Sequence, residues 1–198
     1  MSEIFGDRDD FAIEAGVEFD RHTAGTVWGH MCVWCRGVAL GDLKNRYCGL
    51  YHAYYEFAWL ADKLGTLWAI ELAGLDDLTT WNFLDALLYG YHGDVELLDT
   101  RTSAEIGRDA KRWYRFGFLT NWGEQFDGYK SFLVCPPGDS ARILSRRLLP
   151  LMGRGVQVSK SGLVTAATRF TAWFESESAR LGIPCQRYTN PSTCAADN

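Results

Sequence analysis

The first pattern along the chain is a strict alternation of apolar and polar positions in residues 11–19, with Phe11, Ile13, Ala15, Val17 and Phe19 in the apolar series. A period of two is typical of a β-strand with one buried face and one solvated face. Residues 26–36 alternate in the same way after a turn at 21–25. We therefore expect two antiparallel strands joined as a hairpin.

Between Leu50 and Glu71 the apolar residues recur at steps of three and four instead, which is the spacing of an amphipathic helix. The apolar face comprises Leu50, Tyr54, Phe57, Leu60, Ala61, Leu64 and Trp68. At about 100° per residue, the opposite face carries His52, Tyr55, Trp59 and Thr66. The pattern predicts one long central helix.

The rest of the chain predicts shorter elements. A helix over 79–89 would be capped by Thr79 or Thr80, and residues 90–102 read as a loop. Segments 115–119 and 129–135 are typical of a strand pair, and the Arg-rich alternation of 141–147 suits an edge strand. Ser161 would cap a C-terminal helix that ends at 182–184.

Together these elements predict the α+β class, an antiparallel β-sheet with packed α-helices that include the long central helix and the C-terminal helix. At 198 residues the chain is long enough for one sizeable core. We expect a single domain over residues 1–183, followed by a tail over 184–198.

The charge is unevenly distributed along the chain. The formal net charge is −5, yet residues 1–20 alone hold seven acidic residues and one basic residue, and residues 101–115 are basic. This pattern lacks the basic stripe of a nucleic-acid-binding protein and favours a basic protein partner, or else a merely solvated acidic edge. The acidic candidates for contact with a partner are Asp7, Asp9, Asp10, Glu14 and Glu18.

A second candidate contact surface lies on the polar face of the predicted central helix. There Tyr55 and Trp59 stand beside Asp62, and exposed Tyr and Trp next to charges are typical of interface hot spots. The alternative is that another helix covers these rings. Trp28 and Trp34, on the outer face of the second strand, present the same choice.

The sequence offers little catalytic or metal-binding chemistry. His30, Cys32 and Cys35 could suggest zinc, but a structural zinc site needs about four ligands and no second Cys-x-x-Cys is present. No phosphate-binding loop or Gly-x-Ser-x-Gly occurs, and the histidines, at positions 22, 30, 52 and 92, share no recurring spacing. We predict no catalytic residue, no cofactor and no metal.

The N-terminus lacks the basic start and apolar run of a signal peptide, and no run of about 18 apolar residues could cross a membrane. We therefore expect a cytoplasmic protein that binds neither membrane nor nucleic acid. In that compartment the six cysteines would be reduced thiols, whereas an oxidising compartment would allow a Cys185–Cys194 disulfide.

Several short motifs resemble those of the immunity protein 42 family of bacterial polymorphic toxin systems. They are the Ile-Phe-Gly-Asp of residues 4–7 followed by 11–14, the Gly-His-Met-Cys-Val-Trp of 29–34 followed by Gly41 and Asp42, and residues 123–130. Their order and spacing agree across about residues 3–181. Gly6, Gly41, Asp42, Phe126, Asp127 and Gly128 match the family's pattern, where they have the character of turn and strand-entry positions.

The resemblance implies a cytoplasmic, non-enzymatic protein that protects its producer by binding and neutralising a cognate toxin domain. Many such toxins are basic nucleases, and an acidic inhibitor would associate faster with a basic toxin. Two rival hypotheses remain from the residues alone. One is a small hydrolase or transferase built around a histidine, which a deep pocket holding His52 or His30 beside a carboxylate would favour. The other is a general protein-binding adaptor with several partners.

Overall fold

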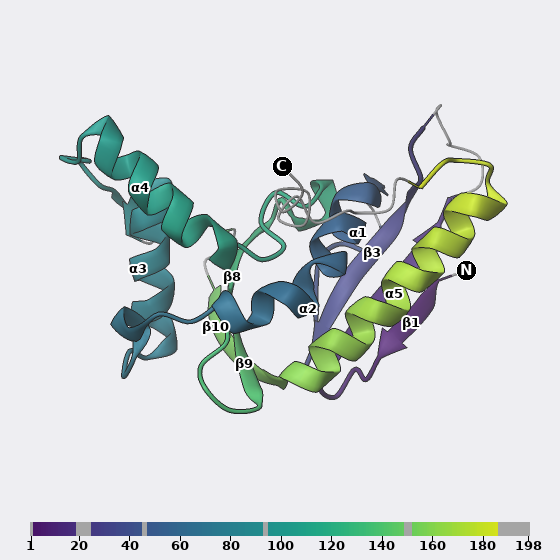
Figure 1. The fold of residues 1–198 in the computed structure, drawn as a ribbon, viewed down its shortest axis with the longest axis horizontal. Helices are drawn as coiled ribbons and strands as arrows, with labels where there is room; N and C mark the ends of the chain where they lie inside the picture. Colours follow the sequence, from purple (N-terminus) through teal and green to yellow (C-terminus); the bar gives the residue numbers. More distant parts are fainter. Residues whose placement is uncertain (1, 19–24, 45–46, 93–94, 149–151, 186–198) are drawn as a thin grey trace, which may run out of the picture.

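The computed structural model describes residues 2–18, 25–44, 47–92, 95–148 and 152–185. Within these ranges the chain forms a five-stranded sheet, a three-stranded sheet and a small two-stranded hairpin, together with five α-helices. Figure 1 shows the first sheet beside α5 at one end of the molecule, and α3 and α4 beside the second sheet at the other end. The predicted α+β class is confirmed.

The predicted N-terminal hairpin forms the centre of the first sheet. Strand β2 (Phe11–Val17) pairs antiparallel with β3 (Trp28–Cys35), in a register that sets Phe11 opposite Cys35. Strand β1 (Glu3–Gly6) lies along the free edge of β2, while β4 (Val38–Leu40) and β5 (Cys48–Gly49) both pair with β3. Helix α5 (Lys160–Arg180) packs on β1 and β2, which explains why one face of the hairpin is apolar.

The expectation that one face of β2 is solvated is wrong, because the whole strand is buried. Glu14, on the face away from α5, is only 6% exposed. The Trp34 side chain donates a hydrogen bond to the Glu14 carboxylate, and the Arg8 guanidinium lies 4.3 Å from the Trp34 ring centre. These long side chains lie over the sheet and cover the small residues between them. The polar positions of the alternating pattern are therefore buried as well.

The predicted long central helix is interrupted. It is divided into α1 (Tyr51–Ala58), α2 (Leu60–Lys63) and two 3₁₀ turns, η1 (Leu64–Thr66) and η2 (Ile70–Leu72). Gly65 falls where the regular helix ends, and glycine is among the weakest helix formers. The predicted apolar face is nevertheless correct in its main positions, since the buried side chains include Leu50, Tyr54, Phe57, Leu60 and Leu64.

Between the two sheets in sequence lie α3 (Asp77–Tyr89), the hairpin of β6 (Tyr91–His92) and β7 (Val95–Glu96), and α4 (Ser103–Trp113). Helix α3 begins earlier than expected, because the Asp76 side chain accepts a hydrogen bond from the Thr79 backbone N–H and so caps it. Helix α4 was not predicted. Its one buried side chain is Trp113, so it lacks an apolar stripe, although Thr102 and Glu105 form a capping box at its start.

The second sheet has the order β10–β9–β8, with β8 at Tyr129–Val134, β9 at Ser140–Arg147 and β10 at Met152–Ser159. The prediction that 141–147 is an edge strand is wrong, since β9 is central. Strand β10 escaped prediction because glycines interrupt its alternation. The strand predicted at 115–119 is also wrong: the chain there forms the 3₁₀ turn η3 (Tyr114–Phe116) and a single bridge from Gly117 to Phe132.

The C-terminal helix α5 is confirmed, but its cap is Ser159 instead of Ser161, since the Ser159 hydroxyl accepts a hydrogen bond from the Gly162 N–H. The helix ends at Arg180, and Gly182 follows with φ of +68°, as expected for a helix terminus. No helix in the described part of the chain has the length and hydropathy that a membrane span requires. The predicted domain boundary at 183 stays a prediction, and residues 186–198 lie outside the described ranges.

Candidate functional site

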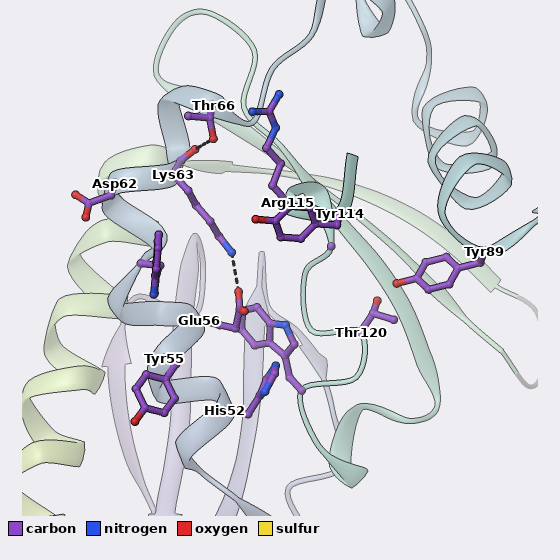
Figure 2. Close-up of a pocket in the computed structure, with 13 residues that line it drawn as sticks. His52, Tyr55, Glu56, Asp62, Lys63, Thr66, Tyr89, Tyr114, Arg115 and Thr120 are labelled. Atoms are coloured by element: carbon purple, nitrogen blue, oxygen red, sulfur yellow. Dashed lines mark hydrogen bonds and ion pairs between the residues drawn. The ribbon is translucent and has the colours of Figure 1, made fainter. Parts of the chain in front are cut away.

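A pocket of about 620 Å³ opens between the broken central helix and the segment that leads into the second sheet. Figure 2 shows its walls: α1, α2 and η1 on one side, Tyr89 at the end of α3, and residues 114–122 on the other. The lining residues are His52, Tyr55, Glu56, Trp59, Asp62, Lys63, Thr66, Tyr89, Tyr114, Arg115, Gly117, Thr120 and Trp122.

The pocket brings together three of the residues that the sequence singled out as partner contacts. Tyr55, Trp59 and Asp62 follow one another at steps of four and three, so they share one face of α1 and α2. The opposite face, which includes Phe57 and Leu60, is buried in the core. Because the helices are held to the core on that side, the polar and aromatic face is fixed toward the pocket.

Several pocket residues were missed by sequence reasoning, because they lie in or next to the segment 115–119 that was predicted to be a strand. Tyr114 is 70% exposed, and Arg115 follows it on η3. Trp122 is buried, and its ring meets the Phe57 ring edge to face with 5.2 Å between the centres. The basic character of residues 101–115 was the one available signal in the sequence that singled out this segment.

The charges within the pocket are partly matched. Lys63 donates a hydrogen bond to the Glu56 carboxylate at 2.7 Å, as the dashed line in Figure 2 marks. That ion pair is about one-sixth to one-third exposed at its two side chains. It holds α2 against α1 and leaves Asp62 and Arg115 without an ion pair among the described residues. The pocket therefore offers aromatic walls, one neutralised pair and two further charges of opposite sign.

His52 tests the rival hypothesis of an enzyme, because it lines this pocket one helical turn from Glu56. A general base needs a partner that orients it. In the described ranges no hydrogen bond joins His52 to a carboxylate, the Glu56 carboxylate is paired with Lys63, and His52 contacts the Trp122 ring with 6.4 Å between the ring centres. His30 lies elsewhere, with its Nε2 3.6 Å from Glu18, and His22 lies outside the described residues.

The cysteines form neither a metal site nor an activated nucleophile where the structure describes them. No group of three His, Cys, Asp or Glu side chains is placed to hold a metal ion within those ranges. Burial raises the pKa of Cys32 and of Cys48 to about 12, and that of Cys135 to about 11. These thiols stay protonated at neutral pH and are poor nucleophiles. Cys185 is described, but Cys194 is not.

The N-terminal acidic residues do not form one surface. Asp7 and Asp9 occupy the exposed turn before β2, whereas Glu18 follows the far end of that strand, about 20 Å away at the usual rise per residue. Two candidates have internal partners. Asp10 accepts a hydrogen bond from the Ser159 N–H at 2.8 Å, and Glu14 is bound by Arg8 and Trp34.

The residues of the family-like motifs lie in turns and at strand entries. Gly6 and Gly41 have φ of +108° and +110°, which favour glycine, and the Phe126 ring packs against Gly41. The Asp42 N–H donates to the Gln125 carbonyl at 3.0 Å, and the Leu148 N–H donates to the Gly128 carbonyl at 2.9 Å. Asp127 follows η4 (Glu124–Phe126), and its side chain is exposed. These positions join the first sheet to the segment before β8.

Comparison with known proteins identifies this arrangement. The chain has the fold of CdiI from Burkholderia dolosa, whose crystal structure it matches with a TM-score of 0.54 at 14% sequence identity, over 86% of this chain and 99% of that one. A search among curated proteins gave no significant match. The model of the immunity protein 42 family matches residues 1–161, and the chain belongs to that family. It is an immunity protein, which neutralises a toxin.

Proposed function

We propose that this immunity protein neutralises its cognate toxin by binding it at the mouth of the pocket, without catalysis. The observation that carries the proposal is that Tyr55, Trp59 and Tyr114 all line one pocket. Large aromatic side chains at a hollow give much contact area for little loss of conformational entropy, and they are enriched among interface hot spots.

The contact surface extends beyond the pocket. Arg112, at the end of α4, forms an ion pair with Glu71 on η2, which places the two elements side by side. Ile70 on η2 is 77% exposed, so this segment offers an apolar side chain to a partner. A stable complex buries roughly 800 Å² on each partner, which is more than one pocket supplies, and these neighbours provide the additional area.

The acidic residues contribute at longer range. Asp7 and Asp9 are exposed, and the chain carries a net charge of −5. If the toxin is a basic nuclease, this charge accelerates the encounter between the two proteins. Asp10 and Glu14 are left out of the contact set because their carboxylates already serve internal contacts. We further propose that the protein acts in the cytoplasm, where a toxin would reach the producing cell's targets.

The proposed absence of catalysis rests on His52 and the cysteines. Among the described residues, no carboxylate is hydrogen-bonded to the pocket histidine, and the buried thiols stay protonated. An enzyme that destroyed the toxin would act substoichiometrically. A protein that inhibits by binding instead neutralises at most one equivalent of toxin. Titration of a fixed amount of toxin with the immunity protein therefore distinguishes the two mechanisms.

The direct experiment is expression of the toxin domain encoded beside this gene, alone and with the immunity protein. The wild type should restore growth and co-purify with the toxin, and Trp59→Ala or Tyr55→Ala should weaken both. A matched control is Tyr91→Ala, which removes a partly exposed tyrosine on the β6–β7 hairpin that does not line the pocket. Equal killing with and without the wild-type protein, and no complex, would refute the proposal. A general adaptor would instead retain several unrelated partners.

A further inference from the structure

Arg115 occupies an unusual position in the pocket. It follows Tyr114 on η3, and its guanidinium carbon lies 5.6 Å from the centre of the Phe116 ring. Its Nε atom is buried and has no hydrogen-bond partner among the described residues. A buried donor without an acceptor destabilises a protein, so a carboxylate that reached this guanidinium would relieve that penalty on binding.

Several other arginines in the described chain are already matched with acidic residues. Arg101 binds both Asp99 and Asp109 at 2.7 Å, and Arg142 binds Asp77 at the same distance. Lys63, the second cation of the pocket, is satisfied by Glu56. Arg115 lines the pocket that also holds Tyr55 and Trp59, and it has no carboxylate within 4.0 Å where the structure describes the chain.

The surroundings of Arg115 favour an anion. Tyr114 stands next to it at the mouth, and Figure 2 shows the two side chains together on the wall opposite Tyr55. A toxin segment that fills the pocket would displace water from around Arg115, which strengthens an ion pair relative to one on an open surface. Lys111, exposed on the adjacent helix α4, adds positive potential nearby.

We propose that Arg115 receives an acidic side chain of the toxin, an aspartate or glutamate carried on a segment that enters the pocket. The planar guanidinium can donate two parallel hydrogen bonds to a carboxylate, which fixes both position and orientation. This inference rests on the proposed function, since it specifies the chemistry of the toxin element that the pocket binds. A toxin that is basic overall can still present one such carboxylate.

The test uses the full chain and the purified toxin domain, with the dissociation constant measured by isothermal titration calorimetry. Arg115→Gln should weaken binding by about 30-fold or more, as expected for loss of one partner of a desolvated charge pair. The dissociation constant of Arg115→Lys should lie between those of the wild type and Arg115→Gln, because lysine keeps the charge but cannot donate two parallel hydrogen bonds. The control Arg108→Gln removes an arginine whose side chain is 72% exposed, and it should change the constant by less than about threefold.

A double-mutant cycle then identifies the partner. Each exposed Asp and Glu of the toxin is changed to Asn or Gln. For one of these toxin variants, the affinity lost on combination with Arg115→Gln should be little more than the affinity lost by either variant alone. Strictly additive losses of affinity at every acidic position would overturn the inference. Thermal unfolding of each variant shows whether it is folded. Failure of the wild type to bind refutes the proposed function, while tight binding by a folded Arg115→Gln variant refutes this inference alone.

Discussion

The carboxylate of Asp10 accepts a hydrogen bond from the backbone N–H of Ser159 at 2.8 Å and also bonds the Ser159 hydroxyl. Residues 10 and 159 belong to opposite ends of the domain in sequence. Ser159 ends β10 and caps α5, so this contact ties the turn between β1 and β2 to the start of the helix that covers them. An acidic residue suggested by sequence as a partner contact is therefore a structural link.

Asp10→Ala should lower the free energy of unfolding by about 2 kcal/mol, because it removes two hydrogen bonds to a charged acceptor and leaves the Ser159 N–H without a partner. Urea denaturation measures this loss. Asp9→Ala is the matched control: its side chain is exposed, and the change should stay within about 0.5 kcal/mol. Equal stabilities of the two variants would show that the Asp10 contact does not support the fold.

Glu14 should make the stability depend on pH in the acidic range. Burial raises the pKa of its carboxyl, but hydrogen bonds from Arg8, Trp34 and Ser2 outweigh burial and leave the pKa below the ordinary glutamate value. The carboxylate therefore contributes stability that is complete above the ordinary pKa of about 4.3 and is lost as the pH falls through the lowered pKa.

The variant Glu14→Gln tests this dependence. It should be less stable than the wild type by about 1–3 kcal/mol at neutral pH, where it loses charge-assisted hydrogen bonds. The difference should shrink as the pH falls through the lowered pKa, because the wild-type carboxylate becomes protonated there. A difference that stays constant across an acid titration of the unfolding free energy would contradict the assigned role of the charge.

The ion pair between Asp85 and Lys130 links α3 to β8. Lys130 donates to the Asp85 carboxylate at 2.7 Å, and the Asp85 side chain is completely buried. Burial raises the pKa of Asp85 despite the nearby lysine. Lys130→Met should destabilise the protein by about 3 kcal/mol at neutral pH, since a buried charge loses its partner.

The companion change Asp85→Leu in the Lys130→Met background should recover more than half of that loss, because no uncompensated charge remains. The destabilisation of Lys130→Met alone should also diminish as the pH falls, since protonation removes the buried charge of Asp85. Lys111→Met, at an exposed lysine on α4, is the control and should be nearly neutral. If the double variant is no more stable than Lys130→Met, the pair does not act as a unit.

Local periodicity predicted the elements whose apolar residues face one core. The β2–β3 hairpin and α5 followed from it, and so did the buried face of α1 and α2 with Phe57 and Leu60. Periodicity could not predict where the central helix breaks, because the end of α2 is set by a single glycine and by tertiary packing. Helix α4 was not predicted for a related reason. Its one buried side chain is Trp113, so its sequence has no periodic apolar face.

The sequence predicted some residues of the candidate site and missed others. Tyr55, Trp59 and Asp62 could be found because they share the face opposite the core side of a helix. Tyr114 and Arg115 come from η3, which is distant in sequence and lacks a periodic signature. The burial of Glu14 was equally hidden, because it depends on Trp34 lying across the sheet from the neighbouring strand. Contacts between segments, rather than patterns within them, decided these outcomes.

Amide hydrogen exchange of the immunity protein, with and without saturating toxin domain, tests the central claim most directly. Protection on binding should concentrate in residues 51–66 and 112–122, the two walls of the pocket. Residues 91–98 around the β6–β7 hairpin should exchange equally in both states. Protection confined to that hairpin or to the exposed face of α5, with the pocket walls unchanged, would contradict the claim that the toxin binds at the pocket.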